Sequence, residues 1–587
     1  MVAAASKSRF RHTGVTDTCG GLGDARSGEE DGGLRPLRAQ VDRVERTGPK
    51  GTCERGTTAE GVPILAPVDE QPPARRRRLA RSTAIFALAT GLSRVLGLVR
   101  EIVARYYFGT VGPINAFEVA FLIPNTVRAL VADAALSSAF VPVFSELLVK
   151  GERKRAWRVA SSLFWLVLLG LGGLTALFIV ISPWIMAAFG YGHLAVGLSR
   201  VLFPIVVLLG LSGIVVGILN SYDHFTVPAL TPVFWNIAII AGLVIGVPRA
   251  NGISAQLYVY AFSILIATVI QFLLPLPWLR GRDGRLQVVI DWRDPAVRQT
   301  LVLMVPITIG LGLINFNAVV DTFFAARLID RFQAPSAINA AFRLYMLPQG
   351  MFSVAVATVL FPSLARLATA ADFDGFRRTV STGIRQIAFL LVPASIFCAV
   401  LAEPIVRLVY QRGDFTPRQT PAVAASLAAF SLGLVFNGFM LMLNRAFFSL
   451  QSPWIPTWVA LGNLGLNAVL DAAFYRLGIW GLPLSTALVN IAGSAALFFL
   501  LRRRLGSLEL HQTASAFVRI VVASAVAGAV AYGLWRGLDD VLGRGLGGQI
   551  VSVGTSLLTA TAAYGLACRA LGVHELQALL ALRRRDK

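Results

Sequence analysis

Long apolar runs separated by short polar segments dominate the chain from Arg81 onward. Runs such as Ser161–Phe189 and Val201–Asn220 reach the roughly 20 residues that a helix needs to cross the hydrocarbon core of a bilayer. They do not alternate with period two, which argues against a transmembrane barrel. The pattern predicts about fourteen spanning helices, near residues 83–107, 115–148, 157–187, 195–220, 229–247, 256–279, 299–327, 337–367, 381–409, 421–449, 454–475, 479–501, 514–535 and 547–570.

Short sequence matches recur along the chain at offsets of 220 to 224 residues. For any one match, chance similarity between apolar segments is an equal explanation, but three matches in the same order favour an internal repeat. We therefore predict an all-α polytopic membrane protein, with two repeat-related six-helix lobes at residues 82–280 and 297–505 and two further helices at 513–572. The matching pairs are Ile114-Asn115-Ala116 with Ile338-Asn339-Ala340, Phe140-Val141-Pro142 with Leu360-Phe361-Pro362, and Leu219-Asn220 with Leu443-Asn444.

Both ends of the chain differ in composition from the spans. Residues 1–81 are rich in Gly, Arg, Pro, Asp and Glu, and contain no apolar stretch typical of a signal peptide. Such a segment buries too little apolar surface to offset its ordering entropy, so it is predicted to be a disordered basic cytoplasmic tail. A start codon assigned too far upstream, with the true start near Leu79, is the alternative explanation. Residues 573–587 form a second predicted cytoplasmic tail.

The placement of charge predicts the orientation in the membrane. A net charge of +22 is compatible with nucleic-acid binding, but the arginines lie in short clusters between apolar runs, such as Lys150–Arg158 and Arg280–Arg298. The intervening loops are poorer, and Phe108–Ile114 contains neither Lys nor Arg. This is the positive-inside pattern of an inner-membrane protein with both termini in the cytoplasm, and it argues against a nucleic-acid partner.

Nothing in the sequence indicates an enzyme. There is no P-loop, no G-x-S-x-G and no H-E-x-x-H motif, and the four cysteines have no C-x-x-C spacing. A membrane glycosyltransferase would need catalytic carboxylates at the outer face, where Asp414, Asp539 and Asp540 show no organisation into a site. A purely structural scaffold would not need ionisable residues inside its spans.

Several predicted spans nevertheless contain ionisable residues, which cost several kcal/mol in a bilayer and commonly face a cavity. In the first span, Arg94, Glu101 and Arg105 share one helical face. Snorkelling or internal ion pairing is the alternative role for these side chains. Arginines around a cavity suit a phosphate or diphosphate, because the guanidinium fork matches phosphate oxygens, and would repel a cationic drug. The other ionisable residues of this set are Arg100, Arg128, Asp133 and Arg343, and the second span also carries the polar Asn125.

A second polar set lies in the later spans. Asn467 and Asp471 are one helical turn apart, and Asp321 and Thr486 lie in two other spans. Two carboxylates, an amide oxygen and a hydroxyl are hard ligands that suit a small cation. From spacing alone, however, hydrogen bonding between helices is the favoured role for these residues.

The chain resembles the MurJ/MviN family of lipid II flippases, within the multidrug/oligosaccharidyl-lipid/polysaccharide exporter superfamily. The resemblance covers roughly residues 82–570. Its strongest part runs from Ser93–Glu101 to Phe140-Val141-Pro142, and a second stretch joins Phe342-Arg343-Leu344 to Phe361-Pro362-Ser363-Leu364. It implies two lobes around a cationic cavity and a lipid-tail groove formed with residues 513–572. It also implies movement of lipid II, a diphosphate-linked peptidoglycan precursor, from the inner to the outer leaflet of the bacterial inner membrane.

The resemblance also assigns roles to residues. It places substrate-binding arginines at Arg94, Arg100, Arg128 and Arg343, with Glu101 as their acidic partner. It reverses the preference from spacing by implying a sodium site at Asp321, Asn467, Asp471 and Thr486; no other cofactor is expected. Asn115 stands where the family often has Asp, so this chain has no carboxylate at that position. Cell-wall synthesis proteins are candidate partners. A flippase for another undecaprenyl-linked glycan and a cation-coupled drug exporter remain the alternative functions.

Overall fold

The computed structural model describes residues 73–131, 135–506 and 509–576. Every regular element within these ranges is a helix, as expected. Residues 1–72 and 577–587 of the two expected tails, and Asp133, lie outside the described residues. The helices are α1 Pro73–Phe108, α2 Ile114–Val131, α3 Ala135–Val149, α4 Arg153–Ala188, α5 His193–Leu202, α6 Pro204–Ser221, α7 Thr226–Gly246, η2 Val247–Arg249, α8 Ile253–Leu273, η3 Leu276–Leu279, α9 Pro295–Phe324, η4 Ala325–Ile329, α10 Ala334–Pro348, η5 Gln349–Ser353, α11 Val354–Thr369, α12 Phe373–Val400, α13 Ala402–Tyr410, α14 Thr420–Ser449, α15 Trp454–Phe474, η6 Tyr475–Leu477, α16 Gly481–Leu505, α17 Leu510–Leu542 and α18 Leu546–Ala570.

Ten helical segments of the described chain are long and apolar enough to cross a membrane. They coincide with ten of the expected spans, and the other four expected ranges contain α1, α2 with α3, α9 and α15. The protein is therefore an all-helical chain with many membrane-spanning segments. The count of fourteen and the division into two equivalent lobes stay predictions.

The start of α1 corrects one expected boundary. This helix begins at Pro73, so residues 73–81 are helical rather than part of a disordered tail. Proline is well suited to the first position of a helix because its missing N–H would be unpaired there. The arginine run that follows has a high intrinsic helix propensity, which favours a helix there despite the low apolar content.

Several expected spans consist of more than one helix, and prolines mark some of the interruptions. The range 337–367 contains α10, the π-helical turn η5 and α11, with Pro348 as the last residue of α10. Pro204 begins α6 directly after α5. Because proline lacks an amide donor and its ring clashes with the preceding turn, it breaks or kinks a helix. Pro124 precedes Pro348 by 224 residues, the offset of the predicted repeat, and lies inside α2.

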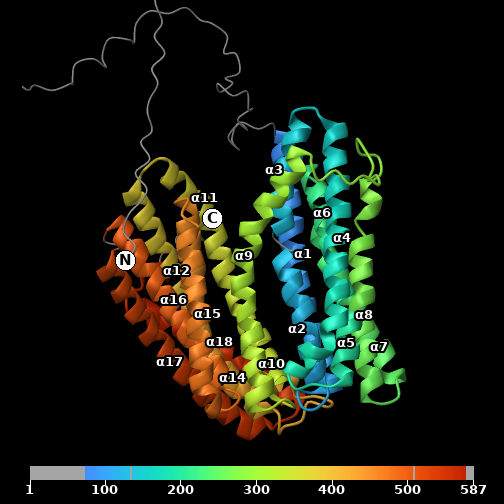
Figure 1. Ribbon diagram of the computed structural model, residues 1–587. Coiled ribbons are helices and arrows are strands. Elements are labelled where there is room, and N and C mark those ends of the chain that lie inside the picture. The colour runs from blue at the N-terminus through green and yellow to red at the C-terminus, as the bar shows by residue number, and fades with distance from the viewer. Residues whose placement is uncertain (1–72, 132–134, 507–508, 577–587) are drawn as a thin grey trace, which may run out of the picture. The chain divides into compact units, whose positions relative to one another are not determined.

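The helices pack in two sets, with α9 and α10 between them (Figure 1). In the first set, α1 packs on α7, α7 on α8, and α6 on α3, α4 and α8. In the second set, α14 packs on α12 and α16, and α17 on α12 and α18. The helix α9 contacts α2 and α3 on one side and α15 on the other, and α10 contacts both α14 and α2. The two sets converge at the lower end of the view in Figure 1.

A buried ion pair fixes α17 to α13 in the second set. The Arg407 guanidinium donates to both carboxylate oxygens of Asp539, at 3.2 and 3.3 Å, and the side chains are only 6% and 8% exposed. The sequence showed no organisation around Asp539, because its partner lies 132 residues away. The structure thus gives this carboxylate a packing role.

Candidate functional site

Near the C-terminal end of α1, the charged residues of one helical face form a buried network of ion pairs. Arg105, 2% exposed, donates to Glu101 Oε1 from Nε at 2.9 Å and from Nη2 at 2.7 Å. Its Nη2 also donates to Glu118 Oε1 at 2.7 Å, and its Nη1 to the Ser336 hydroxyl. Arg105 therefore has the alternative role given above, internal ion pairing. Its guanidinium is occupied by these bonds and is not free to bind a ligand.

Glu118 and Asn339 extend this network across to α10. Glu118 Oε2 accepts from Asn339 Nδ2 at 2.9 Å, and Asn339 Oδ1 accepts from Arg343 Nε at 3.2 Å. Arg343 Nε lies 3.9 Å from Glu101 Oε2, which closes a ring of side chains. We call Glu101, Arg105, Glu118, Asn339 and Arg343 the polar ring. It joins α1, α2 and α10.

Sequence reasoning found Glu101 and Arg343 but missed Glu118 and did not give Asn339 a role in the site. A signal for each was present. Glu118 is an acid inside an expected apolar span, and Asn339 is the repeat counterpart of Asn115. Asn339 also lies one turn before Arg343, so the two side chains share a face of α10.

Arg343 is the accessible member of the polar ring. Its side chain is 40% exposed, whereas those of Glu101, Arg105 and Glu118 are 7%, 2% and 12% exposed. An anion that reaches this site would therefore meet the Arg343 guanidinium first, and would compete for it with Glu101 and Asn339.

The other predicted arginines of α1 lie on different neighbours. Arg94 lies against Gly350 of η5, where a Cβ would overlap its Nη1. Arg100 donates to Asn236 Oδ1 at 3.2 Å and stacks over the Trp235 ring at 4.9 Å, both on α7. Its Nε is buried without a hydrogen-bond partner among the described residues. Arg94 therefore lies against η5 and Arg100 on α7 of the first set, whereas Glu101 and Arg343 meet where α1 approaches α10.

Arg128 is bonded within its own helix. Its Nε and Nη2 donate to Asn125 Oδ1, one turn earlier on α2, at 3.1 and 3.0 Å. Both side chains are partly exposed. These bonds orient the Arg128 guanidinium without assigning it a ligand, and its substrate role stays a prediction.

Asn115 fastens the turn between α1 and α2 to the segment before α10. It is fully buried, and its Nδ2 donates to the carbonyls of Thr110 at 3.0 Å and Phe332 at 2.5 Å. Its Oδ1 accepts from the Ser336 backbone amide at 2.8 Å. These bonds need both a donor and an acceptor, so a neutral amide fits where an ionised Asp, an acceptor only, would not.

A second fastening joins the same turn to the segment between α13 and α14. Gln419 Oε1 accepts from the Thr110 amide at 2.7 Å and from its hydroxyl at 2.9 Å. The Asp414 amide donates to the Tyr106 carbonyl at 2.9 Å. We call these contacts, together with the Asn115 bonds, the latch. The latch ties residues 106–115 of the first set to the segments 332–336 and 413–419. They occur at the end where the two sets converge in Figure 1.

The predicted cation residues are brought together from three helices. Asn467 Nδ2, on α15, donates to Asp321 Oδ1 of α9 at 2.5 Å and to Asp471 Oδ2 at 3.0 Å. Thr486 Oγ1, on α16, lies 3.5 Å from Asp321 Oδ2. Asn467 and Asp471 are fully buried, and Asp471 Oδ1 has no hydrogen-bond partner within the described part of the chain.

This donor set fits a hard cation better than a transition metal. Within the described residues, no group of three or more His, Cys, Asp and Glu could hold a metal ion, so soft or imidazole-rich coordination is not offered there. Two carboxylates, a hydroxyl and an amide oxygen, the last presented by turning over the Asn467 amide, would supply oxygen ligands. The unpartnered Asp471 oxygen is the atom that such an ion would satisfy.

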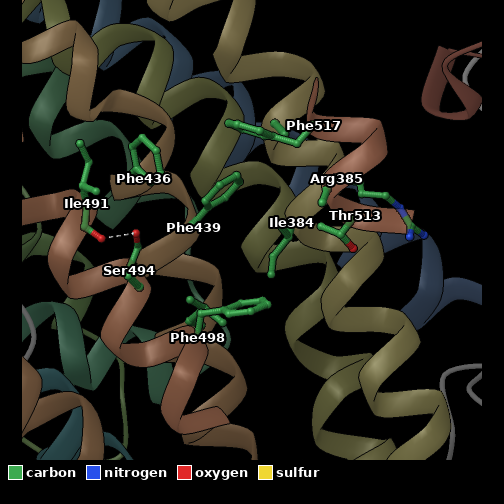
Figure 2. A pocket seen from close by; sticks show the side chains of 13 residues that line it. Ile384, Arg385, Phe436, Phe439, Ile491, Ser494, Phe498, Thr513 and Phe517 are labelled. Carbon is green, nitrogen blue, oxygen red and sulfur yellow. Dashed lines mark hydrogen bonds between the residues drawn. The ribbon is translucent and has the colours of Figure 1, made fainter. Parts of the chain in front are cut away.

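A mainly apolar cavity of about 300 Å³ lies between α12, α14, α16 and α17. Figure 2 shows the aromatic side chains of Phe436, Phe439, Phe498 and Phe517 around it, with Arg385 near its rim. The expected groove drew on both of the last two helices, but of these two only α17 contributes described residues to this lining. The lining residues are Ile384, Arg385, Ala388, Phe436, Phe439, Leu443, Ile491, Ser494, Ala495, Phe498, Thr513, Ala514 and Phe517.

Comparison with known proteins supports one family. The family model described as lipid II flippase MurJ matches residues 104–538. A probable lipid II flippase MurJ of Vibrio cholerae is 32% identical over 481 residues, covering 78% of this chain and 89% of that protein. A lipid II flippase MurJ of Burkholderia cenocepacia is 31% identical over 458 residues, covering 76% and 87%.

Solved structures show the same fold. One described as lipid II flippase MurJ in an inward closed conformation has a TM-score of 0.69 at 24% identity, covering 83% of this chain and 99% of the other. An inward-facing transporter of the multidrug resistance MATE family has a TM-score of 0.59 at 16% identity, covering 72% and 95%. At these identities the likeness concerns the fold alone, whereas the sequence matches extend over most of the chain and of its relatives. The chain therefore belongs to the lipid II flippase MurJ family.

Proposed function

We propose that this chain is a lipid II flippase, which moves the diphosphate-linked peptidoglycan precursor from the inner to the outer leaflet of a bacterial inner membrane. Membership of a family of transporters supports a transport role rather than catalysis. The observation that carries the proposal on this chain is Arg343, an exposed guanidinium held in a polar ring where α1 and α2 meet α10.

The chemistry of the substrate explains why such a site is needed. A diphosphate and its sugars cannot cross hydrocarbon unaided, because burying unpaired charge is prohibitive. Arginine forks can hold phosphate oxygens while the head group passes between the helices. Alternating access would then require the two sets of helices to part at the latch and close at the opposite end. An inside-negative potential would favour outward movement of negative charge by about 2.3 kcal/mol per charge per 100 mV.

The apolar cavity between α12, α14, α16 and α17 is the proposed position of part of the polyprenyl tail. Its lining is mainly aliphatic and aromatic, so it offers an isoprenoid chain surroundings similar to those in lipid. This leaves the tail in an apolar environment while the head group occupies the arginine site. We further propose that both termini face the cytoplasm and that cell-wall synthesis proteins are its partners.

Complementation provides the test of this function. Expression of the full chain is expected to restore growth of a bacterium depleted of its own lipid II flippase. A strain lacking a flippase for another undecaprenyl-linked glycan provides the comparison, because the same cationic site would suit that substrate too. Rescue of the second strain alone would reassign the substrate, and rescue of neither, with normal membrane abundance, would contradict the proposal.

Sodium is the proposed ion at Asp321, Asn467, Asp471 and Thr486. Two carboxylates that share one amide donor repel each other unless a cation or a proton lies between them. A bound sodium ion would satisfy both and hold α9, α15 and α16 together. A change in its occupancy could bias transport only if the ion binds one conformation better than the other.

We expect sodium to raise the thermal unfolding temperature of the purified protein more than potassium does, because a ligand specific for the folded state stabilises it. Asp471→Asn should reduce this difference between the two ions. Asp539→Asn is the matched control, since it neutralises a buried carboxylate outside this group of residues. It should lower the unfolding temperature but leave the difference between sodium and potassium unchanged. Equal stabilisation of the parent by both ions would return these four residues to a role in helix packing.

A further inference from the structure

The polar ring balances its charges internally. Arg105 and Arg343 oppose Glu101 and Glu118, and Asn339 carries the connection between Glu118 and Arg343 through its amide. Arg105 bonds both carboxylates, at 2.7 Å each. The ring is thus close to neutral as it stands, although it includes the exposed Arg343 guanidinium that an incoming anion would meet.

Glu118 differs from the other members in what it contacts. Its Oε1 neutralises Arg105 on α1, while its Oε2 holds the Asn339 amide on α10. Fixing Asn339 Nδ2 in this way leaves Asn339 Oδ1 facing Arg343 Nε at 3.2 Å. Glu118 therefore orients the Arg343 guanidinium through Asn339 and adds a negative charge near it.

We propose that Glu118 is a positioning residue that sets the affinity of the Arg343 site for an anionic head group. This inference rests on the proposed function, because it concerns the same substrate site. The diphosphate competes with Glu101 and Asn339 for Arg343. Glu118 lowers the affinity of Arg343 for the diphosphate, so that the head group can be released again. A flippase needs this property, since a site that holds the substrate too tightly in one state delays its release.

Two charge substitutions of opposite sign test the idea. Glu118→Gln removes a negative charge from a poorly hydrated site, so undecaprenyl diphosphate should bind about tenfold more tightly. Asn339→Asp adds a carboxylate directly beside Arg343 and should weaken binding by a similar factor. In transport assays, Glu118→Gln should lower the substrate concentration for half-maximal rate and also the maximal rate, because release becomes slower.

The measurement is binding of undecaprenyl diphosphate to the purified full chain in detergent, with undecaprenol as the uncharged probe. Undecaprenol affinity should not change in either variant, since only the charge at the ring is altered. Asp539→Asn serves as the control for loss of a buried carboxylate, because it should lower the unfolding temperature and leave diphosphate affinity unchanged. Thermal unfolding of all three variants verifies that each is folded.

The possible results separate the two proposals. Opposite shifts in diphosphate affinity for Glu118→Gln and Asn339→Asp support the positioning role. Equal or absent shifts, with diphosphate still bound by the parent more tightly than undecaprenol, would overturn that role and leave the flippase proposal standing. A parent that binds both probes equally would instead contradict the anion site itself.

Discussion

Replacing Arg343 by alanine is expected to abolish rescue of a flippase-depleted bacterium while the protein stays at normal abundance in the membrane. Its side chain is 40% exposed, and it is held by a bond to Asn339 and an approach to Glu101 rather than by burial in the helix packing. Without it, the ring keeps Glu101 and Glu118 against Arg105 alone, so the site changes from neutral to negative. A diphosphate would then be repelled where it was attracted.

The size of this effect follows from the chemistry of a guanidinium bound to a diphosphate. Truncating one partner of a buried charge pair costs about 2–5 kcal/mol. Because the Arg343 side chain is 40% exposed, we expect the lower part of this range, about 2–3 kcal/mol, or roughly thirty- to a hundredfold in affinity. Arg343→Lys should keep a weak activity, because an ammonium supplies the charge without the planar fork. The affinity for undecaprenyl diphosphate should therefore fall in the order Arg, Lys, Ala.

Arg366→Ala is the matched control for the Arg343 variants. Arg366 lies on α11, in the same expected span, and its exposed side chain donates to Ser363 Oγ at 3.3 Å. Its removal should leave rescue unchanged. If Arg343→Ala rescues as well as Arg366→Ala does, the substrate does not depend on this guanidinium and the cationic site must be sought elsewhere.

The chain's apolar pattern was sufficient to predict where the helices lie. Each expected range contains a helix, because a bilayer leaves the backbone of an apolar run no partner but itself. The breaks within spans were harder to place. Pro204 begins α6 after α5, and Pro404 lies in the first turn of α13, four residues after α12 ends at Val400, where its ring would clash with the carbonyl of a continuing helix. Proline alone does not place the breaks, however, because Pro393 lies inside α12 without ending it.

The candidate site could be predicted only in part, for a physical reason. An arginine in an apolar span, such as Arg343, is visible in the sequence because its cost there requires an explanation. The contact between Glu118 and Asn339 is not visible, because the two residues are 221 positions apart, although each carries a signal of its own. The cation residues illustrate the same limit. Asn467 and Asp471 are one turn apart, but Asp321 reaches Asn467 across 146 residues, and only family resemblance placed it there.

Gly413→Ala is expected to open the latch. Gly413 has a φ of +59°, and a Cβ there would overlap the backbone carbonyl oxygen of Tyr106 on α1. The left-handed backbone costs an alanine about 1 kcal/mol. The overlap adds to this, and a backbone atom cannot rotate away as a side chain would. The strain is relieved only if residues 413–419 separate from the end of α1, which lengthens the bond from the Asp414 amide to the Tyr106 carbonyl.

Gly478→Ala separates the two causes of strain. Gly478 has a φ of +87°, but a Cβ there would meet no described atom within 4 Å. It therefore shares the backbone cost without the overlap. Hydrogen exchange followed by mass spectrometry provides the measurement, because the Thr110 and Asp414 amides are both donors in the latch. Peptides that contain these amides should exchange about tenfold faster in Gly413→Ala, which corresponds to a loss of about 1.4 kcal/mol in the free energy of closing the latch. In Gly478→Ala they should exchange at the parent rate. Unchanged exchange in Gly413→Ala would mean that the close approach to Tyr106 does not hold the two sets of helices together, and that the Asn115 and Gln419 bonds keep this end closed without it.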